Sequence, residues 1–201
     1  ITGATQGIGR ITARELAKLG PTMVLVVRDE QRGRELAAEL RAAGNPHVEI
    51  LVADLSSQAE VRRVAAEFLA RHDRLDLLIN NAGALFMERK ESVDGLEMTF
   101  ALNHLGYFLL TNLLIDVLKK SAPARVVSVA SRAHGRGTIS FDDLQSKRGY
   151  SGWSAYSQSK LANILFSNEL ARRLDGSGVT SNCLHPGVVA TGFGKNNSGL
   201  M

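Results

Sequence analysis

Short apolar segments alternate with longer helical segments along almost the whole chain, and this alternation limits its fold more than any other feature. Five runs of strand length fall at about 23–27, 48–53, 75–79, 125–129 and 179–184. The same reading predicts helices at about 7–19, 30–43, 57–71, 96–120 and 155–174. Strands that alternate with helices form parallel sheets, because each connection crosses over in a right-handed sense. The sequence predicts an α/β fold, a doubly wound parallel sheet with helices on both faces.

The length and composition are those of one folded domain without a membrane span. The chain has 201 residues, of which 44% are hydrophobic and 22% are charged, as is ordinary for a globular protein. No run approaches the roughly 18 apolar residues that a membrane-spanning helix needs. We expect a single domain over residues 1–201.

The charge distribution and the cysteine content argue against a nucleic-acid-binding or disulfide-stabilised protein. The net charge of +4 comes from basic residues mixed with acidic ones, not from a basic stripe, so nucleic-acid binding is not expected. The single cysteine, Cys183, cannot form an internal disulfide or a cysteine metal cluster. A reducing compartment suits such a chain, and we expect a cytoplasmic location.

The chain opens at the end of a strand. Ile1 and Thr2 lead directly into a glycine-rich turn, with no initiator methionine before them. In a doubly wound sheet, the strand that feeds this turn is central and buried on both faces. We therefore expect that most of the first strand is missing and that the chain is a fragment of a longer protein.

The glycine-rich turn at residues 3–9 has the spacing of a phosphate-binding loop. Glycine permits positive φ angles and close approach of a ligand, while the helix that follows offers free N–H groups and a partial positive charge. A flexible turn without a ligand is the alternative. The residues predicted to bind the pyrophosphate of a dinucleotide are Gly3, Thr5, Gln6, Gly7, Ile8 and Gly9.

Polar residues also follow the next three strands. Arg28 ends the first of them, where an arginine favours a 2′-phosphate, whereas a carboxylate such as Asp29 favours a 2′-hydroxyl. We expect NADP(H) to be preferred, with NAD(H) as the alternative. The cofactor contacts predicted after the other two strands, where an ordinary loop also fits, are Asp54, Leu55, Asn81, Ala82 and Gly83.

Tyr156 and Lys160 are four residues apart in a predicted helix, so both project from one face. An ammonium group beside a phenol stabilises the phenolate and lowers the tyrosine pKa from about 10. We expect Tyr156 to exchange a proton near neutral pH. In isolation, such a pair occurs by chance on many helices.

The combination of motifs is far more specific than any one of them. The order Thr2-Gly3-x-x-x-Gly7-Ile8-Gly9, Asn80-Asn81-Ala82-Gly83, Asn103, Ser131, Tyr156-x-x-x-Lys160 and Pro186-Gly187 resembles the short-chain dehydrogenase/reductase family over essentially the whole chain. The segments at 28–33, 103–111, 159–163 and 185–189 resemble its retinol-dehydrogenase-like and WW-domain-oxidoreductase-like members.

The resemblance implies an NAD(P)-binding Rossmann domain that moves hydride between a nicotinamide cofactor and a carbonyl or alcohol, without metal. It implies that Tyr156 is the general acid or base, that Ser131 polarises the carbonyl oxygen, and that Lys160 binds the nicotinamide ribose. Asn103 would hold a water in a proton relay to Lys160. Ser128 is a competing candidate for the serine.

The resemblance also concerns the C-terminal part of the chain. It implies that Pro186, Gly187 and Thr191 lie beside the nicotinamide, and that the family chain continues past Thr191 into C-terminal elements that this sequence lacks. His104, His134 and His185 lack metal-ligand spacing, so no metal site is expected.

Two other classes of function share part of this pattern. Epimerases and dehydratases share the Tyr-x-x-x-Lys pair but usually have a different glycine spacing. A non-catalytic dinucleotide sensor, or an inactive fragment, would not need all four catalytic positions filled. We expect an enzyme acting on a small or lipophilic carbonyl or alcohol, and a homodimer or homotetramer formed by apolar helices near residues 102–118 and 161–170.

Overall fold

The computed structural model describes residues 1–187, 189, 193–194 and 197. The predicted strands are present as β1 (Met23–Val27), β2 (Val48–Val52), β3 (Leu77–Asn80), β4 (Ala124–Val129) and β5 (Val179–Leu184). β1 pairs with β2, β3 with β4 and β4 with β5, and every pair is parallel. The predicted α/β class is confirmed.

Residues 1–3 join the two groups of strands. The Thr2 N–H donates to the Ile79 carbonyl beside β3 at 3.0 Å, and the Val26 N–H in β1 donates to the Ile1 carbonyl at 2.9 Å. The order across the sheet is therefore β2, β1, residues 1–3, β3, β4 and β5. After residues 1–3 the chain forms β1 and β2 on one side of this centre and then crosses to form β3, β4 and β5 on the other side. The glycine-rich turn therefore lies at the switch point of the sheet, where α/β proteins bind ligands.

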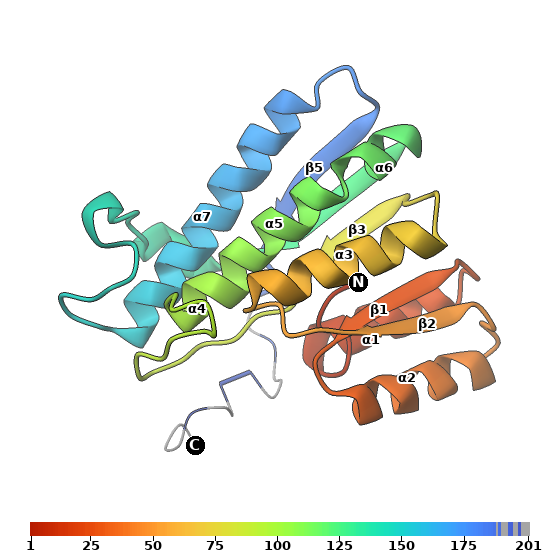
Figure 1. The fold of residues 1–201 in the computed structure, drawn as a ribbon, viewed down its shortest axis with the longest axis horizontal. Helices are drawn as coiled ribbons and strands as arrows, with labels where there is room; N and C mark the ends of the chain where they lie inside the picture. The colour runs from red at the N-terminus through yellow and green to blue at the C-terminus, as the bar shows by residue number, and fades with distance from the viewer. Residues whose placement is uncertain (188, 190–192, 195–196, 198–201) are drawn as a thin grey trace.

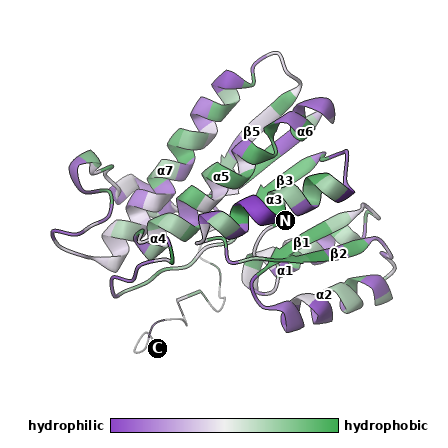
Figure 2. Ribbon diagram, in the orientation of Figure 1, coloured by the Kyte–Doolittle hydropathy of each residue, from purple (hydrophilic) through white to green (hydrophobic). Residues whose placement is uncertain are grey.

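Helices cover both faces of the strands (Figure 1). On one face, α1 (Gly7–Ala17) and α2 (Glu30–Ala42) pack on Leu25 and Val27 of β1. On the other, α3 (Gln58–Arg71), α5 (Gly106–Leu113) and α7 (Gly152–Arg173) lie across a core that includes Val26. Successive strand residues point to opposite faces, so a continuously apolar strand serves both layers. Figure 2 shows β1, β2 and β3 largely in the hydrophobic colour, while the helices alternate between hydrophobic and hydrophilic colours.

The helix predicted over 96–120 is present from Met98 to Lys120 but is not one regular helix. The segment is divided into α4 (Met98–Phe100), a π-helical turn η1 (Ala101–Leu105), α5, and α6 (Ile115–Lys120). The π turn surrounds Asn103, whose amide bonds to the backbone of Ala84 on a neighbouring loop. Single π turns inside helices are frequent at functional sites, and this one aims Asn103 away from the helix.

The segment between β4 and α7 was predicted as a polar loop and contains two short 3₁₀ turns, η2 (Arg132–Arg136) and η3 (Phe141–Asp143). α7 begins at Gly152, three residues earlier than predicted, because the Ser151 side chain accepts a hydrogen bond from the Ser154 N–H.

Among the described residues, no helix combines the length and apolarity needed to cross a membrane.

Candidate active site

A cavity of about 1030 Å³ opens at the carboxyl ends of the strands. Asn103 does not line it but lies behind it, and Thr191 falls outside the described residues. The other predicted site residues all line it, namely Gly3, Thr5, Gln6, Gly7, Ile8, Gly9, Arg28, Asp54, Leu55, Asn81, Ala82, Gly83, Ser131, Tyr156, Lys160, Pro186 and Gly187.

The start of α1 is built to receive an anion. The N-cap side chains of α2, α3 and α7 each accept a backbone N–H, whereas Gln6 at the start of α1 makes no such bond. Uncapped N–H groups at a helix start carry partial positive charge. Gly3 and Gly7 have φ angles of +66° and +54°, which glycine adopts at little cost. This cradle fits the pyrophosphate of a dinucleotide.

The turn is tied to the strand beside it. The Asn81 side-chain amide donates to the carbonyls of Thr2 and Gly3 at 2.9 and 3.0 Å. The Thr2 hydroxyl accepts the N–H groups of Asn81 and Ala82 at 2.9 and 3.0 Å. The amide of Asn81 therefore positions the cradle by hydrogen bonds to the neighbouring turn.

Replacing Gly9 by alanine should disrupt this cradle. A Cβ at this position would lie 2.4 Å from both the Gly3 oxygen and the Asn81 Nδ2, so the backbone must shift. We expect a loss of roughly 1–3 kcal/mol in the free energy of unfolding, as for other overpacked sites, together with weaker dinucleotide binding. Denaturant unfolding and cofactor titration would measure both. Gly135→Ala is the control, because nothing lies within 4 Å of its Cβ position, and equal effects of the two changes would contradict the assignment.

One arginine and two aspartates line the part of the cavity that follows β1 and β2. Arg28 is exposed after β1 and forms no ion pair within the described part of the chain. Asp29 caps α2, accepting the Arg32 N–H at 3.1 Å. Asp54 accepts the N–H and hydroxyl of Ser56 at 2.9 and 2.7 Å. The Asp29 carboxylate is thus committed to a helix, and Arg28 remains for an anionic group.

Ser131, Tyr156 and Lys160 come together at the opposite end of the cavity. Tyr156 and Lys160 project from one face of α7, as predicted, and both are buried. Burial raises the pKa of Tyr156, and a hydrogen bond with Ser131 partly lowers it. Ser128, the competing serine, is fully buried in β4 and does not line the cavity.

Lys160 is held among aromatic rings. Its ammonium lies 5.6 Å from the ring centroid of Tyr156 and 5.7 Å from that of Tyr107, and it donates to the Val129 carbonyl at 2.8 Å. Burial lowers the Lys160 pKa to about 8. The expected lowering of the Tyr156 pKa by Lys160 is therefore not found, because the ammonium faces the ring and a backbone carbonyl.

Asn103 is fully buried and already fully partnered. Its side chain bonds both backbone groups of Ala84 at 2.9 Å and donates to the Ser159 hydroxyl at 3.1 Å. Its main-chain carbonyl accepts the Asn163 amide at 2.9 Å. A Cβ added to Gly83 would lie 3.1 Å from the Asn103 Oδ1 and 3.6 Å from the Lys160 Nζ, so both side chains lie close to this glycine. The structure gives Asn103 a scaffolding contact toward Ala84, and the water-holding role remains a prediction.

Some residues that line the cavity were not predicted from the sequence. Trp153 and Phe86 form an aromatic wall, and the Trp153 ring packs edge-on against Tyr156 at 6.2 Å. Trp153 precedes Tyr156 by three residues on α7, a spacing that puts both on one face and could have revealed it. Arg132 and Arg136 also line the cavity, and only their position after Ser131 hinted at this.

An α/β sheet with an uncapped glycine-rich helix start at its switch point, and a tyrosine–lysine pair across the same cavity, defines a dinucleotide-binding protein of the oxidoreductase type. Residues 1–199 match the family model described as short chain dehydrogenase. The chain belongs to the short-chain dehydrogenase family, which confirms the resemblance seen in its motifs.

Known relatives support this assignment. The chain is 46% identical over 210 residues to retinol dehydrogenase 14 from Homo sapiens, covering 98% of this chain and 62% of the relative. It is 48% identical over 198 residues to retinol dehydrogenase 13 from Homo sapiens, covering 98% of this chain and 60% of the relative. The chain thus spans about three fifths of the length of these relatives.

Solved structures share the fold. A protein from Mycobacterium paratuberculosis is 43% identical with a TM-score of 0.82, covering 92% of this chain and 66% of that chain. The NADP complex of Pseudomonas aeruginosa RhlG is 33% identical with a TM-score of 0.77, covering 95% of this chain and 72% of that chain.

Proposed function

We propose that the protein transfers hydride between NADP(H) and a carbonyl or alcohol, with Tyr156 as the general acid or base. The observation that carries this proposal is the meeting of Ser131, Tyr156 and Lys160 at one end of a cavity whose other end is an anion cradle. The cavity walls, the uncapped helix start and Arg28 provide the donors that an NADP molecule requires. The nicotinamide supplies or accepts the hydride when bound.

Each catalytic side chain has a separate task in this proposal. In reduction, the carbonyl carbon gains the hydride and its oxygen gains the Tyr156 proton, so an alcohol forms and the cofactor is oxidised. Ser131 donates a hydrogen bond to the same oxygen, which polarises the carbonyl. Lys160 binds the ribose hydroxyls and so holds the nicotinamide beside Tyr156. Oxidation of NADPH by the full chain with a panel of aldehydes tests the proposal, and no turnover across the panel would favour a non-catalytic dinucleotide sensor.

The preference for NADP(H) rests on Arg28. A guanidinium can bind a 2′-phosphate bidentately, and the neighbouring Asp29 is occupied as the cap of α2. We expect Arg28→Ala to weaken NADPH binding roughly 10- to 100-fold, the range of hydrogen bonds to charged groups, and to leave NADH binding unchanged. Titration of both cofactors measures this. Arg62→Ala, an exposed change outside the cavity, is the control, and tighter binding of NADH by the unchanged protein would contradict the preference.

A homodimer is proposed from the outer faces of α5 and α7. Phe108 and Leu165 are 47% and 51% exposed, and Phe108 packs on Phe166 at 5.3 Å between ring centroids. Burying such a patch against a second copy would remove apolar surface from water. We expect sedimentation to give a dimer or tetramer that Phe108→Asp dissociates and Phe141→Asp, an exposed change on η3, does not. A monomer at micromolar concentration would contradict this.

A further inference from the structure

Two arginines that have no anionic partner among the described residues line the cavity near Tyr156. Arg132 and Arg136 belong to η2, which directly follows Ser131. Most other arginines of the chain are ion-paired, as Arg34 is with Glu30 and Arg63 with Glu60. Neither η2 arginine forms an ion pair within residues 1–187 or the few described beyond them. Both side chains are exposed to the cavity and free to bind a ligand.

Among the described residues that line the cavity, none near Arg132 and Arg136 carries a carboxylate. Within the described lining, the acidic residues are Asp29 and Asp54, which follow β1 and β2 at the other end. Each is already engaged, Asp29 by α2 and Asp54 by Ser56. A partly enclosed wall of one charge sign concentrates ligands of the opposite sign.

The backbone holds η2 against the aromatic wall. The Arg132 N–H donates to the His185 Nδ1 at 3.2 Å. At the other end of η2, a Cβ on Gly137 would lie 2.6 Å from the Ser157 carbonyl oxygen, so this glycine touches α7 one turn after Trp153. The arginines therefore border the same space as the Trp153 and Tyr156 rings, while Arg28 serves the opposite end.

We propose that the substrate is an oxo-carboxylic acid whose apolar body lies along Trp153 and Phe86 and whose carboxylate binds Arg132 and Arg136. This inference rests on the proposed function, because it places the reacting carbonyl at Tyr156. Arginine pairs with carboxylates in a planar, bidentate geometry that a neutral substrate cannot use. The reduced product is the corresponding hydroxy acid, formed by one hydride and one proton while the cofactor is oxidised.

A binding experiment tests the anion subsite without requiring turnover. Octanoate and 1-octanol are titrated into the full chain with NADPH bound, and the fluorescence of Trp153 reports occupancy of the wall. Trp153→Phe identifies the part of the signal that comes from this ring. We expect octanoate to bind about tenfold more tightly than octanol, a difference equal to about 1.4 kcal/mol.

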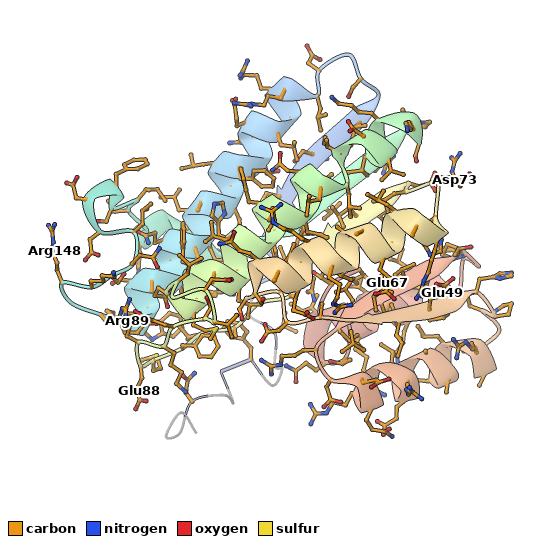
Figure 3. The ribbon with its side chains drawn as sticks, in the orientation of Figure 1. Glu49, Glu67, Asp73, Glu88, Arg89 and Arg148 are labelled. Carbon is orange, nitrogen blue, oxygen red and sulfur yellow. The ribbon has the colours of Figure 1, made fainter. Side chains whose placement is uncertain are left out.

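Variants assign that preference to the two arginines. The double change Arg132→Gln and Arg136→Gln should abolish the preference and leave NADPH binding intact. The control is Arg148→Gln. Arg148 is exposed, is labelled in Figure 3 and lies outside the cavity lining, so this change should preserve the preference for octanoate. Equal binding of octanoate and octanol by the unchanged protein, or a preference that survives the double change, would overturn the inference.

A kinetic arm separates this inference from the proposed function. With NADPH, 8-oxooctanoate should be reduced with a kcat/KM about tenfold above that of octanal, and the double variant should lose this ratio. Turnover of octanal without a carboxylate preference would overturn the subsite and retain the function. Selective binding of octanoate without turnover of either aldehyde would retain the anion subsite and reject the reductase function.

Discussion

Turnover should fall by roughly 10²–10⁴ when Tyr156 is replaced by phenylalanine, the range expected for loss of a general acid. The change keeps the ring that packs against Trp153 and lies beneath the Lys160 ammonium, so NADPH affinity should barely change. It deletes the hydroxyl that interacts with Ser131. The measurement is single-turnover reduction of a generic aldehyde with saturating NADPH in the full chain.

Tyr107→Phe is the matched control. The Tyr107 hydroxyl is buried and has no hydrogen-bond partner among the described residues, and Tyr107 does not line the cavity. Removing this hydroxyl should leave turnover within about twofold and, by relieving an unsatisfied group, should not reduce stability. Near-normal turnover in Tyr156→Phe would defeat the catalytic assignment and favour the dinucleotide sensor.

Replacing Lys160 by methionine should weaken NADPH binding and turnover together while making the protein more stable. Loss of hydrogen bonds from a charged group should cost roughly 10- to 100-fold in affinity. Turnover should fall as well, because the hydrogen bonds proposed to hold the nicotinamide ribose beside Tyr156 are lost. One variant thus affects chemistry alone and the other affects chemistry and binding. Cofactor titration and single-turnover kinetics on both variants distinguish the two patterns.

The gain in stability follows from the pKa of Lys160. Burial lowers it from 10.5 to about 8, so between these pH values the folded chain holds fewer protons on this group than the unfolded chain. The stability of the unchanged protein should therefore rise with pH through this window. Below pH 8 the buried charge opposes folding, and Lys160→Met should raise the free energy of unfolding by about 1–3 kcal/mol.

Urea unfolding at pH 7 and pH 10 checks this linkage. The difference between the two proteins should be largest at pH 7 and should shrink at pH 10. Equal stability of both proteins at both pH values would show that the ammonium is solvated in solution. A loss of stability at pH 7 would show that its bond to the Val129 carbonyl outweighs the cost of burial.

Much of the fold could be predicted from local pattern. The strand β1 is continuously apolar because it is buried between two helical layers, and the other strands are short, mainly apolar runs that can be recognised without knowing their neighbours. The start of the helix predicted at about 57–71 is also a local feature, because the Ser57 side chain caps α3 by accepting the Glu60 N–H three residues away. Tyr156 and Lys160 share a face for the same local reason, because helix geometry brings residues four apart together.

Contacts between distant segments decided the rest. The break in the helix near Asn103 depends on Ala84, which lies on another loop. Asp29 reads from sequence as a carboxylate beside the ribose, yet its bond to the Arg32 N–H commits it to α2. The direction of the Lys160 ammonium depends on Val129 of β4 and on the Tyr107 ring of α5.

The sequence by itself therefore determined the class of fold, the glycine-rich cradle and the candidate acid, because each depends on spacing within one segment. Only the tertiary structure decided how the groups are charged and which are free to act. Burial lowers the pKa of Lys160 and raises that of Tyr156, and burial is a property of packed neighbours. The tertiary structure also gives Arg132 and Arg136 no ion-pair partner among the residues it describes, since ion pairing depends on which elements the fold brings together.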